Sequence, residues 1–235
     1  MKYMFLEFKF IKRDMNKILL LCVVFPLFGT MICLKGGMFH SNSLTESMEF
    51  LFGSVNLSSA NWMYWLLLCF GYVILFQLIW KKREKNVEHN VLILLQDTSL
   101  YYINRLAIGL FFTLLYVSSA FFIAIVSCII FLGMSFRIHL SILLMFVCIV
   151  VNFYLHAVLL MFLKFYTTNH FANVFILTLF FAGVKMQAPF MPLYYGMIDH
   201  FRGYHVLLFV LLIEVLLMLF LGYIIVKKFE NKDYF

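Results

Sequence analysis

Residues 106–133 read LAIGLFFTLLYVSSAFFIAIVSCIIFLG, a run of 28 residues without one charged side chain. About 20 apolar residues are enough for a helix to cross the hydrocarbon core of a bilayer. A helix that is apolar on every side is typical of a membrane span or of the interior of a large protein. Because this run exceeds the needed length, it predicts a transmembrane helix with room to tilt.

Similar apolar runs occur on both sides of this one, and together they predict six transmembrane helices at residues 18–34, 62–80, 106–133, 140–162, 171–184 and 206–226. Between the last two, residues 188–196 read APFMPLYYG, and two prolines with a glycine disfavour a full helix. We expect a short re-entrant or interfacial segment there, with its backbone satisfied by protein. The fold class is therefore an all-α membrane protein, formed by residues 1–235 as one unit.

The composition supports this class. Of the 235 residues, 65% are hydrophobic and only 12% are charged, and the mean hydropathy is +0.99. Soluble domains have roughly 45–50% apolar and about 25% charged residues. The net charge of +7 could indicate a nucleic-acid partner, but the basic residues cluster beside the apolar runs. We therefore expect a lipid bilayer, and no nucleic acid, as the surroundings.

The distribution of the basic residues predicts the orientation. If the N-terminus is cytoplasmic, 14 of the 18 Lys and Arg residues are cytoplasmic and four are outside, namely Lys35, Arg137, Lys185 and Arg202. Cytoplasmic loops carry the excess of such residues. We expect a multi-pass protein of the cell membrane with both termini in the cytoplasm, and residues 36–61 as a polar external loop.

Residues 1–17 carry apolar and basic side chains at helical spacing, which predicts an amphipathic helix on the cytoplasmic membrane surface. The chain contains no phosphate-binding loop, no Gly-x-Ser-x-Gly and no His-Glu-x-x-His. Its five cysteines all lie in apolar runs, which argues against a disulfide framework. We predict no catalytic residues, no metal site and no enzyme activity in this chain.

Residues 81–105 form the most informative polar segment. A basic cluster, KKREK at 81–85, is followed by Glu88, the apolar run 91–95, and a polar break, QDTS at 96–99. Asp97 or Thr98 can cap a short helix. That helix would carry Tyr101, Tyr102 and Arg105 along the membrane surface.

In this segment the chain resembles the permease subunits of the ABC-2 exporter family, in which a similar stretch leads to a short coupling helix before the third span. The C-terminal Phe229-Glu-Asn-Lys-Asp233 is similar to that family's ending. Asn90 stands where the family often has glycine, and the proline of the following turn is absent.

The resemblance implies a permease subunit that binds separate ABC ATPase subunits, which would hold ATP and Mg. It also implies a second permease copy, identical or related. The residues expected to couple to the ATPase are Glu88, Asp97, Thr98, Ser99, Tyr101, Tyr102 and Arg105. In its small size the chain resembles the permeases of exporters that handle membrane-active peptides, such as lantibiotic immunity pumps and phenol-soluble-modulin exporters. An alternative is a non-transporting immunity or sensor protein that acts by binding a partner.

Several polar residues fall inside the predicted spans. Ser141, Cys148, Asn152 and His156 share one face of the fourth span, and Glu214 is the acidic residue well inside the sixth. Such residues usually face a bundle interior or a wet cavity. Asn152, His156 and Glu214 are candidates for the substrate pathway, with His156 the expected partner of Glu214; the alternative is helix–helix hydrogen bonding. On the third span, small residues predict a close-packing face formed by Gly109, Thr113, Ala120, Ala124 and Ser127.

Overall fold

The computed structural model describes residues 11–36, 43–55, 59–80, 98–135, 139–186, 188–201 and 203–230. Within these ranges the order of elements is η1 (Lys12–Asp14), α2 (Met15–Lys35), α3 (Leu44–Phe52), α4 (Ser59–Ile79), α6 (Thr98–Leu132), α7 (Leu140–Tyr166), α8 (Asn169–Met186), η2 (Pro192–Gly196), η3 (Ile198–His200) and α9 (Tyr204–Glu230), where η marks a 3-10 helix. No strand occurs in the described ranges. Six of these helices, namely α2, α4, α6, α7, α8 and α9, are long and apolar enough to cross a membrane, as the sequence predicts.

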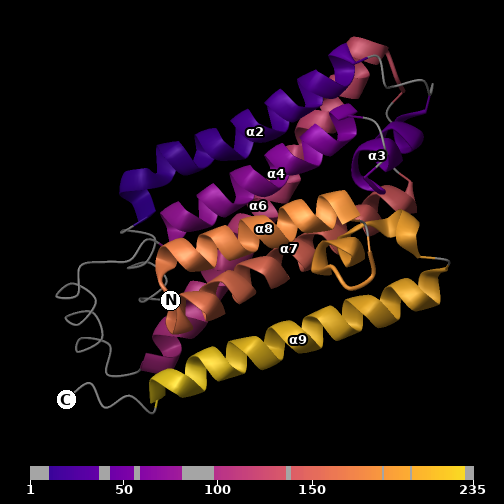
Figure 1. The fold of residues 1–235 in the computed structure, drawn as a ribbon. Helices are drawn as coiled ribbons and strands as arrows, with labels where there is room; N and C mark the ends of the chain where they lie inside the picture. The colour runs from indigo at the N-terminus through magenta and orange to yellow at the C-terminus, as the bar shows by residue number, and fades with distance from the viewer. Residues whose placement is uncertain are drawn as a thin grey trace.

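The six long helices run alternately up and down in one bundle (Figure 1). α2, α6 and α8 begin at the end where α4, α7 and α9 finish, and α3, η2 and η3 lie at the opposite end, which we call the α3 end. The first end is called the basic end because most of the described basic residues lie there, namely Lys12, Arg13, Lys17, Arg105, Lys164 and Lys227. The α3 end carries the acidic residues Glu46, Glu49 and Asp199, together with Lys35 and Lys185.

Helix α7 is the centre of the bundle and α9 lies at its edge. In the most apolar window of α7, 61% of residues are buried, against 22% in that of α9. α9 packs mainly against α7 and α6, and leaves most of its apolar side chains exposed. A lipid environment suits such a surface, because lipid tails are as apolar as leucine.

The backbone of α2 is completed by a side chain from α6. Pro26 lies inside α2 and has no N–H, so the carbonyl of Cys22, one turn earlier, lacks its helical donor. The hydroxyl of Ser119 on α6 donates to that carbonyl at 2.6 Å. This bond compensates for the proline and fastens α2 to α6.

Tyr72 on α4 connects three helices. Its hydroxyl oxygen lies 2.8 Å from the hydroxyl of Thr113 on α6, and it donates to the carbonyl of Phe153 on α7, also at 2.8 Å. Its ring packs against those of Phe153 and Phe180. Tyr72 is therefore the polar and aromatic link at the middle of the bundle.

The predicted close-packing face of the third span is confirmed. Thr113, Ala120, Ala124 and Ser127 are buried. A Cβ at Gly109 would lie 2.6 Å from the ring of Trp80, which directly follows α4, so a larger residue there would displace that ring.

Two local predictions differ from the structure. Residues 99–105 do not form a separate short helix, because α6 begins at Thr98 and continues unbroken into the third span; no proline or glycine interrupts that stretch. The predicted external loop contains helix α3, whose first turn is capped by the Ser43 hydroxyl accepting from the Glu46 N–H at 3.5 Å. Residues 1–10 of the predicted interfacial helix and residues 81–97 of the predicted coupling segment lie outside the described ranges.

Candidate functional site

Three polar side chains proposed from the sequence are buried in the bundle. Asn152 and His156 lie one turn apart on α7 and are 0% and 1% exposed, and Glu214 on α9 is 4% exposed. Asn152 is the twelfth residue after the first residue of α7, which places it about 18 Å along that helix. The three residues therefore lie deep within the bundle, where polar groups are costly unless hydrogen-bonded.

Asn152 joins three elements through its side-chain amide. Its Nδ2 donates to Oε1 of Glu214 at 2.6 Å and to the carbonyl oxygen of Pro192 at 2.8 Å. The first bond ties α7 to α9, and the second ties α7 to η2. Asn152 is thus the hydrogen-bonding centre of the site.

The expected pairing of Glu214 with His156 is not found. Nδ1 of His156 lies 2.8 Å from the backbone carbonyl of Asn152, and its ring stacks on Phe180 of α8 with centroids 4.3 Å apart. His156 is thus held by α7 and α8, whereas Glu214 meets α7 through Asn152. The sequence places all three residues at mid-span, but their pairing depends on how the helices are rotated about their axes.

The site contains acceptors and a ring nitrogen without partners. Oε2 of Glu214, Oδ1 of Asn152 and Nε2 of His156 are buried and form no hydrogen bond. A buried polar atom without a partner costs free energy comparable to its desolvation. The site can therefore accept a proton or a hydrogen-bond donor.

Two glycines allow η2 to pack against the long helices. A Cβ at Gly196 would lie 3.0 Å from Cβ of Asn152, and a Cβ at Gly183 of α8 would lie 2.7 Å from Cβ of Leu193. Leu193 is completely buried, and η2 contacts both α7 and α8. The Pro-rich segment thus reaches Asn152 in the interior of the bundle, and whether it is re-entrant or interfacial stays a prediction. Its irregular backbone is covered by protein.

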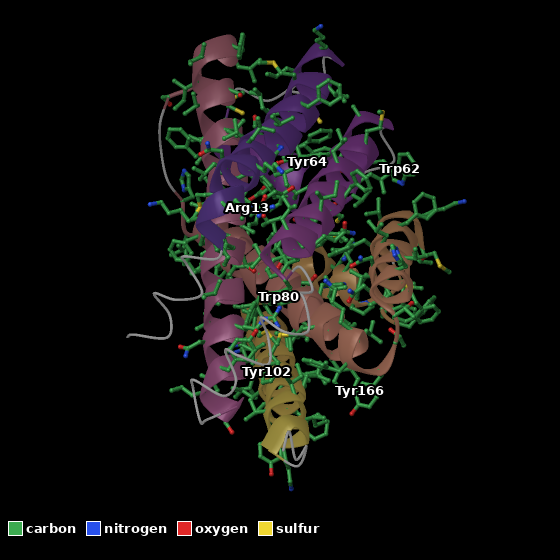
Figure 2. All side chains as sticks on the ribbon, turned by 90° about the vertical axis from the view of Figure 1, so that its left-hand side faces the viewer. Arg13, Trp62, Tyr64, Trp80, Tyr102 and Tyr166 are labelled. Carbon is green, nitrogen blue, oxygen red and sulfur yellow. The ribbon has the colours of Figure 1, made fainter. Side chains whose placement is uncertain are left out.

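The predicted coupling residues that the structure describes lie at the start of α6, near the basic end. Tyr101 and Tyr102 are buried, and the ring of Tyr102 meets that of Phe165 on α7 at 5.6 Å. The guanidinium carbon of Arg105 lies 5.6 Å from the Tyr101 ring centroid. Figure 2, which views the bundle from the basic end, shows Tyr102 in the interior and Tyr166 near the rim. Thr98 and Ser99 form the first turn of α6, whereas Glu88 and Asp97 lie outside the described ranges.

A second polar cluster at the α3 end was not predicted. Burial and the neighbouring charge of Asp199 raise the pKa of Glu49, although the Ser141 hydroxyl bonded to its carboxylate acts in the opposite direction. Burial likewise raises the pKa of Asp199, whose backbone N–H donates to the Gly53 carbonyl at 3.1 Å. In the described part of the chain, no group of three or more His, Cys, Asp or Glu residues is arranged to hold a metal ion.

Comparisons of the chain with protein-family models, with curated proteins and with solved structures give no match.

Proposed function

We propose that this chain is the transmembrane permease subunit of an ATP-binding-cassette exporter, which uses separate ATPase subunits to move a hydrophobic or amphipathic substrate, with a membrane-active peptide as the favoured one. The observation that carries the proposal is the polar sequence pattern of residues 81–105, whose described part, residues 98–105, forms the start of α6 at the basic end of a six-span bundle. ABC-2 permeases have a coupling segment at this place. The chain supplies half of a pathway, and a second permease copy supplies the other half.

In this proposal the basic end faces the cytoplasm, since Lys and Arg are enriched on that side of membrane proteins. A single cysteine introduced at Ser54, at the α3 end, tests the orientation once the five buried native cysteines have been replaced. We expect an impermeant thiol reagent to label it from outside intact cells. Labelling from the cytoplasmic side alone would show that the bundle has the opposite orientation.

In the proposed coupling contact, the more exposed residues would meet the ATPase, and the buried residues would transmit its movement to the rest of the bundle. Ile103 is 50% exposed and Arg105 is half-buried, so these residues offer a surface to an ATPase at the start of α6. Tyr101 and Tyr102 are turned into the bundle, where they connect that surface to α7. A push on α6 would thereby reach α7, which carries Asn152 and His156.

The proposal is tested by ATP hydrolysis in proteoliposomes that contain the chain and an ATPase subunit that copurifies with it. We expect the chain alone to hydrolyse no ATP, and the complex to export an amphipathic peptide. Arg105→Glu should uncouple hydrolysis from export, because it reverses the charge at the proposed contact. Lys185→Glu is the matched control, since Lys185 is exposed at the opposite end of the bundle. Equal export by both variants would place the coupling contact elsewhere.

A further inference from the structure

The contact between α7 and α9 contains two buried acceptors on groups that are already hydrogen-bonded to each other. Nδ2 of Asn152 donates to Oε1 of Glu214, which leaves Oδ1 of Asn152 and Oε2 of Glu214 without partners. Glu214 is only 4% exposed and Asn152 is 0% exposed, so bulk water does not solvate either atom. The pair has one hydrogen bond where its chemistry allows two.

The charge of Glu214 decides whether this arrangement is stable. An ionised carboxylate can only accept hydrogen bonds, and so can the amide oxygen, so neither atom can satisfy the other. A protonated carboxyl group has one O–H donor. A proton on Oε2 would let Glu214 donate to Oδ1 of Asn152 while Oε1 accepts from Nδ2, and this second bond would satisfy both unpartnered atoms.

The described groups around Glu214 do not supply a positive charge that would pair with its ionised carboxylate. On α7, Cys148 is near enough to interact with Glu214, Tyr154 donates to the Leu106 carbonyl at 3.0 Å, and His156 is held against α8. The remaining described titratable or charged groups on α9 and on the elements around it are Tyr101, Tyr102, Arg105, Tyr116 and Cys128 on α6, Lys164 and Tyr166 on α7, Tyr194 and Tyr195 in η2, Asp199 and His200 in η3, and Tyr204, His205, Tyr223 and Lys227 on α9. None of these forms an ion pair with Glu214 in the described part of the chain, where the one recorded pair joins Lys17 and Asp14.

A metal cation fits this place poorly. Hard cations such as Ca²⁺ take about six to eight oxygen ligands, whereas two acceptor atoms are unpartnered here. Close packing of Gly196 against Asn152 also restricts the space around the amide. A proton needs only the two atoms that are present.

We propose that Glu214 and Asn152 form an intramembrane proton-binding site, in which one proton on Glu214 completes a two-bond acid–amide pair and holds α9 against α7. Because the amide also bonds Pro192, the same proton supports the position of η2. Loss of the proton places a charged carboxylate opposite the amide oxygen, and α9 can then move away from α7. This proton site does not depend on the proposed exporter function, because it is inferred only from contacts within the helix bundle.

Infrared difference spectroscopy of the full-length chain in lipid vesicles at neutral pH tests this assignment. We expect a carbonyl band of a protonated, hydrogen-bonded carboxylic acid that shifts in D2O and disappears in Glu214→Gln. Glu46→Gln is the control, because Glu46 is exposed at the α3 end, and the band should remain there. Asn152→Leu should keep the band but move it to higher frequency, because the acid carbonyl loses its donor. Absence of the band, or its persistence in Glu214→Gln, would overturn the proposal.

Thermal unfolding distinguishes a proton from a bound cation. Gln at position 214 is neutral and can form both bonds of the pair, so Glu214→Gln should unfold at the wild-type temperature, whereas Glu214→Leu should unfold at a lower one. Stabilisation of the wild type by Na⁺ or K⁺ that is lost in Glu214→Gln would identify a cation site instead. Failure of Glu214→Gln to fold would also refute the proton site, because it would show that the charge is required.

Discussion

Replacing Tyr72 with phenylalanine removes one oxygen atom from the middle of the bundle and leaves the ring in place. That oxygen lies between the Thr113 hydroxyl and the Phe153 carbonyl, at 2.8 Å from each. Neither partner is left without a bond, because Thr113 also bonds the Gly109 carbonyl at 2.9 Å and Phe153 lies inside a helix. The substitution therefore measures the free energy that the hydrogen bonds of this hydroxyl contribute to stability, without leaving a buried polar group unpaired.

The contacts of Tyr72 determine how much stability each substitution should remove. A net hydrogen bond contributes about 0.5–1.5 kcal/mol to stability, and hydrogen bonds between membrane helices average about 0.6 kcal/mol. We expect Tyr72→Phe to lower the free energy of unfolding by about 1 kcal/mol. Tyr72→Ala also removes a ring that packs against Phe76, Phe153 and Phe180, and should cost about 3–5 kcal/mol in total.

Reversible unfolding in mixed micelles, monitored by steric trapping, measures these differences in the free energy of unfolding. Tyr204→Phe is the matched control, since Tyr204 is 64% exposed, and it should change nothing measurable. If Tyr72→Phe costs as much as Tyr72→Ala, the hydroxyl rather than the ring organises the core. The packing described for α4, α6 and α7 would then be refuted.

Two further predictions concern glycine packing and pH. Gly109→Ala should destabilise the bundle by about 1–3 kcal/mol through overpacking against Trp80, whereas Gly222→Ala, whose Cβ would lie 3.5 Å from the nearest side chain, should be neutral in the same unfolding assay. Burial raises the pKa values of Glu49 and Asp199, so the folded state binds their protons more tightly than the unfolded state, and their contribution to stability falls as pH rises above the ordinary carboxyl pKa. Glu49→Gln should reduce that slope in thermal unfolding measured against pH, and a slope equal to that of the wild type would contradict the assigned cause.

The six spans could be predicted because each is a long apolar run, and length with hydropathy is a strong signal. Helix α3 was harder to predict, although Ser43 and Glu46 stand at the spacing of a capping box. It has only nine residues and lies in a polar stretch, where a short helix depends on its contacts with α6 and α7.

The candidate site was predictable in its members and not in its bonds. Asn152, His156 and Glu214 stand out because polar residues are rare in spans. Their pairing depends on helix rotation and on Pro192 reaching Asn152 from a distant segment, which no local pattern encodes. The burial of Tyr101 was likewise not visible in the sequence, because tyrosines near a membrane surface often point towards it.

Purification of the affinity-tagged chain from its native membranes, with identification of the bound proteins by mass spectrometry, tests the proposed function most directly. The account predicts that an ATPase with a phosphate-binding loop copurifies, in equal numbers with the permease chains, and that the complex hydrolyses ATP. Recovery of the folded chain without any ATPase, in a lipid environment that preserves the six-helix bundle, would contradict the exporter proposal and favour an immunity or sensor protein.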